Sequence, residues 1–209
     1  MNETIYNKNG YQFLYVDNWF NKNEEKLIWK ELDFFTQKNI ETSDSLIAKD
    51  ERGVPKGQSF RIYPYKIYSP YGLKYSNLIN LTSKQKTDDF KKLLKKTFGN
   101  YYRSWNSTNS DTFFVSYYEK GDYYNAHIDV AAFSVLLWFY KKPKKFTGGD
   151  LILNDTKEKI ECKHNRLIIF PSWYYHSVTP IHFKNKPKEL GWGRYTLTSF
   201  YQHAPQNDD

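Results

Sequence analysis

Cysteine is almost absent from the sequence: Cys162 is the single one among 209 residues. One thiol excludes an internal disulfide, and it excludes a zinc or iron–sulfur site built from several cysteines. It is typical of a reducing compartment, and we expect a cytoplasmic protein. Any metal that the chain holds must therefore bind to His, Asp or Glu, and histidine is also scarce, with five residues.

Long hydrophobic runs are also lacking. The longest, "VLLWFY", is far too short to cross a bilayer, and the polar start "MNETIYNKNG" does not resemble a signal peptide. We therefore expect a soluble protein with no membrane partner.

Arginine is scarce although the formal net charge is +8. Nucleic-acid readers depend on the planar fork of arginine, whereas lysine favours solvated surfaces. The arginines stand at 52, 61, 103, 166 and 194. The lysine excess, including "KKPKK" at 141–145, indicates solvated surface and turns, so nucleic acid is not an expected partner.

The first half of the chain contains the helical patterns. After a strand at 11–16, the spacing predicts a helix capped by Asn21 or Asn23 and a second helix at 83–98 capped by Ser83. The expected buried stripes are Leu27, Ile28, Leu32 and Phe35 in the first, and Phe90, Leu93, Leu94 and Phe98 in the second. The aromatic stretch "FRIYPYKIYSPYG" between them is interpreted as one or two strands.

From residue 112 onward, short β-rich runs separated by turn residues replace the helical spacing. They are "TFFVSYY", "FSVLLWFY", "GGDLIL", "RLIIF", "HSVTPI" and "RYTLTSFY". Helices followed by many strands predict an α+β fold, mainly β, in which the N-terminal helices pack on one face of an antiparallel jelly roll. We expect a single domain at 1–209, with helical support at about 1–110 and the jelly-roll core at about 111–203.

The stretch "YYNAHID" places His127 and Asp129 on one face of a strand, because successive side chains of a strand alternate. A third ligand is offered by His176, after a Pro-Ser turn. Two imidazoles and a carboxylate form the facial triad that binds Fe(II) with open coordination positions, although zinc accepts the same ligands. The alternative for His127 is a buried histidine that pairs with Asp129 for stability alone.

A late strand carries a candidate anion site. In "GRYTLTSFY", alternation places Arg194, Thr196 and Thr198 on one face. A guanidinium with hydroxyls beside it suits a carboxylate, whereas the alternative is an exposed arginine on an edge strand.

Four segments resemble one family, the prolyl-4-hydroxylase-like branch of the Fe(II)/2-oxoglutarate-dependent dioxygenases. "YEKGDYYNAHID" looks like the approach to its metal site, and "FTGGDLIL" resembles its glycine turn and strand. "IIFPSWYYHSVTPI" is similar to its second-histidine segment, and "GRYTLTSFY" to its arginine strand. They follow the family's order over about 112–201.

The resemblance implies a double-stranded β-helix with Fe(2+) bound by His127, Asp129 and His176. It implies that 2-oxoglutarate is held by Arg194, Thr196 and Tyr118. Oxygen would be consumed, succinate and CO2 released, an unactivated carbon hydroxylated, and ascorbate would serve as reductant.

Two departures from the family pattern bear on the site. Residues 182–193, between His176 and Arg194, form a longer connection than many relatives have, which we interpret as an inserted loop that lies over the site or as a sign that the arginine assignment is off. Trp138 stands where many relatives carry a tyrosine near the co-substrate, so that hydrogen bond is either missing or replaced.

The expected substrate is a prolyl residue in a protein or peptide, or free proline. Candidate substrate contacts are Arg61, which suits a substrate carboxylate, and Tyr124, Trp138 and Trp192. Alternatives are an oxygenase of nucleic acid or another small molecule, and a non-catalytic jelly-roll binding module. Nucleic-acid demethylation is disfavoured because "RYTLTSF" has no second arginine, and a zinc hydrolase because no carboxylate is evidently placed as a base.

Overall fold

The computed structural model describes residues 2–37 and 49–205. The helices are α1 Lys22–Gln37, α2 Pro64–Tyr68, α3 Asn77–Thr82, α4 Asp88–Phe98 and α5 Tyr102–Asn106, with 3-10 turns η2 Leu73–Tyr75, η3 Ser83–Lys86 and η4 Gly99–Tyr101. The first strands are β1 Asn2–Lys8, β2 Tyr11–Asp17, β3 Gly57–Gln58, β4 Phe60–Ile62, β5 Ser110–Tyr118, β6 Tyr123–His127 and β7 Phe133–Phe139. The others are β8 Phe146–Thr147, β9 Leu151–Leu153, β10 Glu158–Ile160, β11 Arg166–Pro171, β12 His176–Val178, β13 His182–Phe183 and β14 Arg194–Gln202.

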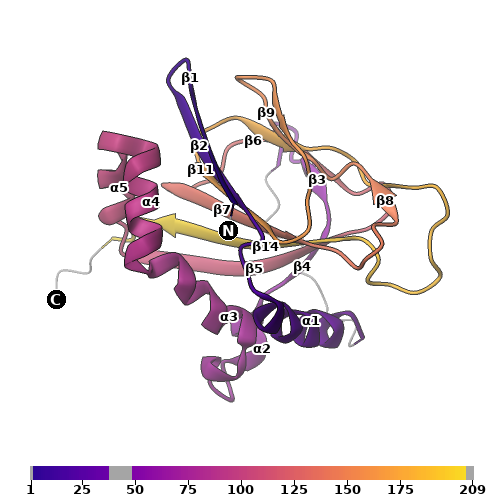
Figure 1. Ribbon diagram of the computed structural model, residues 1–209. Helices are drawn as coiled ribbons and strands as arrows, with labels where there is room; N and C mark the ends of the chain where they lie inside the picture. Colours follow the sequence, from indigo (N-terminus) through magenta and orange to yellow (C-terminus); the bar gives the residue numbers. More distant parts are fainter. Residues whose placement is uncertain (1, 38–48, 206–209) are drawn as a thin grey trace.

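Two large antiparallel sheets and a small two-stranded one make up the β structure of the described residues (Figure 1). The larger has seven strands in the order β1-β2-β11-β7-β14-β5-β4, and the smaller has five in the order β10-β9-β12-β6-β3. A two-stranded ribbon of β13 and β8 lies at one end. The helices gather on one side of the larger sheet, with the smaller sheet on the other side. The predicted α+β jelly roll with helices on one face is confirmed.

Burial on both faces explains why the sequence of strand β7 does not alternate between apolar and polar residues. All seven of its residues are buried. Val135, Leu137 and Phe139 belong to the apolar cluster between the larger sheet and the helices. Leu136 and Trp138 belong to the second cluster, which fills the space between the two sheets. A strand covered on both faces favours apolar side chains in succession, as over residues 135–139, and its one polar residue, Ser134, has hydrogen-bond partners.

Helix α1 begins with the cap that its sequence predicts. Asn21 Oδ1 accepts hydrogen bonds from the backbone N–H groups of Asn23 and Glu24, at 2.9 and 3.0 Å, and Glu24 returns a bond to the N–H of Asn21. The predicted stripe is wrong at one position. Leu27 is 44% exposed, while Glu31 is buried and accepts a hydrogen bond from Ser76 of the segment that leads into α3.

The second predicted helix starts later than expected. Ser83 opens the 3-10 turn η3, and α4 begins only after Thr87, whose side chain accepts the N–H of Phe90. The prediction was wrong because Thr87 is extended, with ψ 153°, and this breaks the run. Within α4, Phe90, Leu94 and Phe98 are buried as expected.

The aromatic stretch after residue 59 is only partly a strand. Strand β4 covers Phe60–Ile62, and Pro64 then starts helix α2. Proline is favoured in the first helical turn because its fixed φ suits the helix and its missing N–H needs no partner there. The interpretation of the whole stretch as strand is therefore wrong from Pro64 onward.

Within the described ranges 2–37 and 49–205, none of the helices combines the length and the apolar character needed to cross a membrane.

Candidate metal and co-substrate site

The three predicted metal ligands meet where two strands of the smaller sheet run side by side. His127 ends β6 and His176 begins β12, and the antiparallel register places the two residues opposite each other. Asp129 lies just beyond β6, where its N–H donates to the carbonyl of Ser172 at 3.0 Å. Ile128, between the two ligands, is 54% exposed and points away from the site.

The ligand atoms of this cluster are close enough to share one ion. One atom from each of His127, Asp129 and His176 lies within 4.8 Å of the others. His127 Nε2 is 3.5 Å from Asp129 Oδ1, and His176 Nε2 is 3.4 Å from Oδ2. Two imidazoles and a carboxylate on one side of an ion are the donor set of Fe(II) sites with open positions, so the residues fit iron.

Both histidines are held in the orientation that a metal requires. Their Nδ1 atoms lie 2.8 Å from the backbone carbonyls of Asn125 and Tyr174. A carbonyl only accepts, so each Nδ1 carries the proton and each Nε2 presents its lone pair to the site. Burial lowers the pKa of His176 more than the neighbouring Asp129 raises it, which favours the neutral, metal-binding imidazole.

Asp129 is kept ionised by its neighbours. Burial alone raises the pKa of this carboxyl, but the hydrogen bond that a protonated His127 donates, the charges of both imidazoles in that protonated state and the hydroxyl of Ser134 outweigh it and hold the pKa below its usual value. Ser134 Oγ donates to Asp129 Oδ2 at 2.6 Å and lies 2.8 Å from Ser172 Oγ. Ser134, itself in hydrogen-bond contact with Ser172, thus holds the carboxylate of Asp129 in place.

A cavity extends from the three ligands to the inner face of the larger sheet. The register places Arg194 opposite Tyr118 and Thr196 opposite Ser116, so β14 and β5 form its wall. The lining residues are Arg61, Phe114, Ser116, Tyr118, Tyr124, His127, Asp129, Leu136, His176, Val178, Arg194, Thr196, Thr198 and Phe200. The candidate ligands and the candidate anion site therefore face one space.

Arg194 is a buried cation in the wall of this cavity. It is 1% exposed, its guanidinium carbon lies 4.1 Å from the centre of the Tyr118 ring, and Nη1 donates to the carbonyl of Gly149. Among the described residues, no carboxylate forms an ion pair with it, and its Nε has no hydrogen-bond partner. The hydroxyl of Thr196, also buried, has no partner there either. An isolated buried charge is costly, and the cost falls when a ligand carboxylate binds.

Two glycines allow the backbone to pack closely around Arg194 and its neighbour Tyr118. A Cβ on Gly149 would lie 3.1 Å from Arg194 Cδ and 2.6 Å from Ile181, and Gly149 has φ +72°. A Cβ on Gly193 would lie 2.0 Å from the carbonyl oxygen of Tyr118. A side chain at Gly149 or Gly193 would therefore collide with its neighbours, so glycine is required at both positions.

Two of the four predicted substrate contacts lie in the cavity wall. Tyr124 stacks on the ring of His127, with 3.7 Å between centroids. The guanidinium of Arg61, on β4, lies over the rings of Phe114 and Tyr124, at 5.1 and 5.8 Å. Gly57 of β3 leaves room for Tyr124, because a Cβ there would lie 2.6 Å from its ring.

The other two predicted contacts lie elsewhere. Trp138 is fully buried in the cluster between the sheets, and Trp192 packs at the border of that cluster beneath Lys141 and Lys145. The described cavity lining includes neither of them and no residue of 182–193. That segment begins with β13, which pairs with β8, and Lys186 forms an ion pair of 2.8 Å with Glu119. The interpretation of the segment as a loop over the site is therefore not supported.

Sequence reasoning missed several residues that complete the site. Ser134 and Ser172, which fix Asp129, and Phe114, Leu136 and Phe200, which line the cavity, were not singled out. Alternation along β5, β7 and β14 is the signal that assigns the last three to the inner face, once the strand partners are known.

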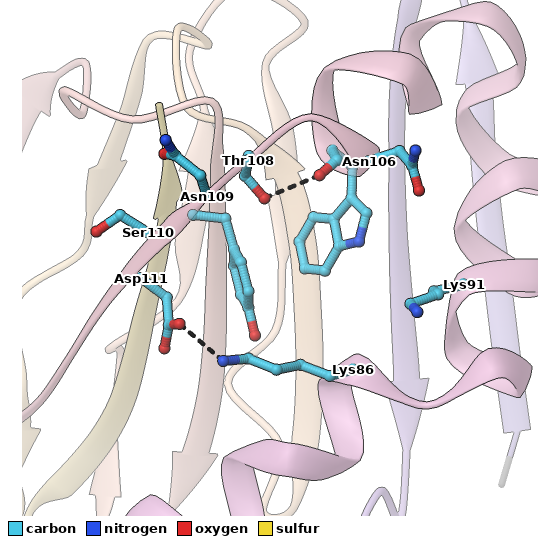
Figure 2. A pocket seen from close by; sticks show the side chains of 9 residues that line it. Lys86, Lys91, Asn106, Thr108, Asn109, Ser110 and Asp111 are labelled. Carbon is cyan, nitrogen blue, oxygen red and sulfur yellow. Dashed lines mark hydrogen bonds and ion pairs between the residues drawn. The ribbon is translucent and has the colours of Figure 1, made fainter. Parts of the chain in front are cut away.

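A second cavity lies on the helix side of the larger sheet (Figure 2). Lys86 reaches across it to Asp111 at 2.7 Å, and Lys91 is 3.6 Å from Asp88. Both lysines in its wall therefore have a carboxylate partner, whereas Arg194 has none among the described residues.

Comparisons with known proteins agree with this geometry. Residues 113–202 match the 2OG-Fe(II) oxygenase superfamily. A PKHD-type hydroxylase of Nitrosomonas eutropha is 29% identical over 83 residues, which are 33% of this chain and 37% of that protein. The match thus spans little more than a third of the curated relative.

Solved prolyl hydroxylases share the fold. The Trichoplax adhaerens prolyl hydroxylase, solved with a hypoxia-inducible-factor peptide fragment, has a TM-score of 0.62 at 18% identity and covers 91% of this chain and 83% of its own. The Pseudomonas putida prolyl-4-hydroxylase has a TM-score of 0.59 at 12% identity, with 93% and 94% covered. Residues 113–202 are therefore similar to the 2OG-Fe(II) oxygenase superfamily, in agreement with the ligand cluster and the arginine strand, and the fold is prolyl-4-hydroxylase-like.

Proposed function

We propose that the protein is an Fe(II)/2-oxoglutarate-dependent dioxygenase that hydroxylates an unactivated carbon and releases succinate and CO2, with residues 1–209 forming one such domain. One observation carries the proposal: a buried arginine without an anionic partner among the described residues faces the same cavity as a His-Asp-His cluster. A stable fold retains an uncompensated buried charge only where function requires it, because the charge costs free energy.

The metal would be held by Nε2 of His127 and His176 and a carboxylate oxygen of Asp129. When bound, Fe(II) supplies the redox chemistry that activates oxygen, with positions left open for co-substrate and oxygen. The protein contributes ligand orientation. The two backbone carbonyls set the imidazole tautomers, and Ser134 sets the carboxylate.

The co-substrate would lie between this cluster and Arg194. The guanidinium and the hydroxyl of Thr196 would bind the far carboxylate of 2-oxoglutarate. The ring of Tyr118, on which the guanidinium stacks, would hold Arg194 in position for this contact. Because Arg194 is 1% exposed, this end of the co-substrate would be shielded from water, which strengthens each charged hydrogen bond.

The proposed substrate is a prolyl residue in a peptide or protein. Support comes from the fold shared with prolyl hydroxylases, one of which was solved with a peptide fragment. Tyr124 and Arg61 would contact the substrate beside the metal ligands. Since a guanidinium suits a carboxylate, free proline is the second candidate, and the two are separated by direct competition.

The test is 2-oxoglutarate turnover by purified protein with Fe(II), ascorbate and oxygen, with succinate followed by NMR and proline peptides and free proline added in parallel. We expect succinate formation that is lost in His127→Ala and kept in His203→Ala, which removes an exposed histidine that forms a hydrogen bond with Ser107. Calorimetry of Mn(II) and 2-oxoglutarate binding accompanies it. Absence of both binding and turnover in the wild type would refute the proposal, as would equal turnover by His127→Ala.

A further inference from the structure

Arg194 lies at a corner of the larger sheet, where backbone pairing ends. Within the sheet that the structure describes, the register of β14 with β5 ends at the pair of Arg194 with Tyr118, and the register of β14 with β7 begins only at Tyr195. The end of a strand ladder opens more readily than its centre, because fewer neighbours hold it. A contact just outside the ladder therefore decides how firmly the backbone of Arg194 is held.

The hydroxyl of Tyr117 makes such a contact. It accepts hydrogen bonds from the backbone N–H groups of Gly191 and Gly193, at 2.7 and 3.1 Å, and donates to a carboxylate oxygen of Glu119. A phenol offers one proton and two lone pairs, so all of its hydrogen-bonding positions are used. Burial raises the pKa of Tyr117, which keeps the hydroxyl protonated and able to donate. Tyr117 thus binds the backbone directly before Arg194.

Glu119 fixes the position of this hydroxyl. Glu119 is 7% exposed, and its backbone N–H donates to Asp122 Oδ2 at 2.8 Å. Its carboxylate also lies 2.8 Å from Lys186 Nζ, which belongs to the same connection that leads to Arg194. One carboxylate therefore binds this connection twice, at Lys186 directly and near its end through Tyr117. Because the side chain of Lys186 is 42% exposed, the buried hydroxyl is expected to contribute more than the ion pair.

Tyr117 can influence a ligand only through the backbone. It belongs to the helix-side cluster, where its ring lies 4.5 Å from that of Tyr195, and the described cavity lining includes Tyr118 but not Tyr117. Gly193 provides the connection. It packs so closely on the last pair of the ladder that a Cβ there would lie 2.0 Å from the carbonyl oxygen of Tyr118. A displacement of Gly193 would therefore displace Arg194 as well.

We propose that Tyr117 is a positioning residue for the co-substrate: its hydroxyl fixes residues 191–193 and thereby holds the guanidinium of Arg194 where it would bind the carboxylate of 2-oxoglutarate. The inference rests on the proposed function. It also gives the long connection 182–193 a role, because this connection carries the two N–H groups and the lysine that fasten the start of β14. An arginine that is already in place needs less ordering when the ligand binds, which favours affinity.

The first experiment compares Tyr117→Phe with Tyr201→Phe. Tyr201 is a matched control, because it is 4% exposed, lies at the other end of β14 and donates its hydroxyl to Gln85 Oε1 at 3.0 Å. Each variant keeps the ring and loses a buried hydroxyl, so both are expected to lose stability. Calorimetry measures 2-oxoglutarate binding to the Mn(II)-loaded proteins.

We expect binding about tenfold weaker in Tyr117→Phe, which corresponds to one hydrogen bond, and wild-type affinity in Tyr201→Phe. Mn(II) affinity should stay the same in both, because the metal ligands lie on the smaller sheet. In turnover by Tyr117→Phe, KM for 2-oxoglutarate should rise while kcat at saturating 2-oxoglutarate is kept.

A second measurement uses the wild type alone. Coupling between two sites is reciprocal, so if the Tyr117 contact favours binding of 2-oxoglutarate, binding must favour that contact. Amide hydrogen exchange is followed by NMR in the Zn(II)-loaded protein. Exchange should slow at the N–H groups of Gly191 and Gly193 when 2-oxoglutarate is added. The N–H of Ala204, which donates to Asn109 Oδ1 beyond the other end of β14, should exchange at an unchanged rate.

The outcomes separate the two proposals. If the wild type binds 2-oxoglutarate and Tyr117→Phe binds it equally well, the positioning role is refuted and the dioxygenase stands. Equal weakening in Tyr201→Phe also refutes it, because loss of any buried hydroxyl would then suffice, and so does unchanged exchange at Gly191 and Gly193. If the wild type binds no 2-oxoglutarate in the presence of metal, the proposed function fails and this inference fails with it.

Discussion

Replacing Arg194 with methionine tests the unpaired charge directly. Met fills a similar buried volume and removes the guanidinium that faces the cavity. Loss of charged hydrogen bonds worth about 2.7 kcal/mol would weaken 2-oxoglutarate binding about 100-fold. The ligand-free variant is expected to be at least as stable as the wild type, because it no longer buries an uncompensated charge.

The magnitude follows from ligand linkage. At a 2-oxoglutarate concentration 100 times the wild-type Kd, binding raises the free energy of unfolding by about 2.7 kcal/mol. With a Kd about 100-fold higher, the same concentration raises it by only about 0.4 kcal/mol. Urea unfolding of the Mn(II)-loaded proteins, with and without 2-oxoglutarate, measures both quantities.

Arg166→Met is the matched control for this prediction. Arg166 is also buried, at 4% exposed, but its Nε and Nη2 bind both oxygens of Asp17 at 2.5 and 2.8 Å. Because Asp17 is partly exposed, breaking this pair should cost less than the about 3–5 kcal/mol typical of a fully buried pair, yet the response to 2-oxoglutarate should remain. A ligand response of wild-type size in Arg194→Met, or a ligand-free stability loss as large as that of Arg166→Met, would refute the reasoning.

Three further predictions concern groups around the site. Ser134→Ala removes the hydroxyl that donates to Asp129 at 2.6 Å, and we expect about tenfold weaker Mn(II) binding by calorimetry. Gly193→Ala would bring a Cβ to 2.0 Å from the carbonyl of Tyr118, so thermal unfolding should shift sharply downward. Burial, assisted by the nearby charge of Glu119, raises the pKa of Asp122 to about 6, so relative to Asp122→Asn the wild type should lose stability as pH rises from about 4 to 6, with no further change above.

Each of these predictions has a contrary result. Unchanged Mn(II) affinity in Ser134→Ala would mean that Asp129 is oriented without the serine. A Gly193→Ala protein with wild-type stability would mean that the turn before β14 relaxes freely. For Asp122, a constant difference in unfolding free energy from pH 4 to 7 would show that this carboxyl titrates alike in the folded and unfolded chain.

Much of the site was predictable because its residues are close in sequence and strands alternate. His127 and Asp129 are two residues apart, and Arg194 and Thr196 share a face, so local geometry assigned their sides before any fold was known. The joining of these segments with His176 came from the resemblance to a family, because pairing between distant strands has no local signature.

The start of the second helix and the end of strand β4 were mispredicted because two local signals competed at each place. Ser83 and Thr87 are both acceptable caps, and only the extended backbone at Thr87 decides between them. Pro64 can end a strand or begin a helix, and the packing of α2 selects the helix. The hydrogen bonds between Tyr117 and residues 191–193 could not be predicted, because they depend on where a distant part of the chain folds back.

The two-sided burial of β7 has a consequence for how this scaffold can change during evolution. Every substitution in β7 disturbs either the helix-side packing or the space between the sheets, so its tolerance for new side chains should be low. Strand β4 differs, because it has three residues, lies beside β5 at the end of the described larger sheet and presents Arg61 to the cavity. New substrate preferences would therefore arise most readily by replacement at this edge, with the central strands left as an invariant frame.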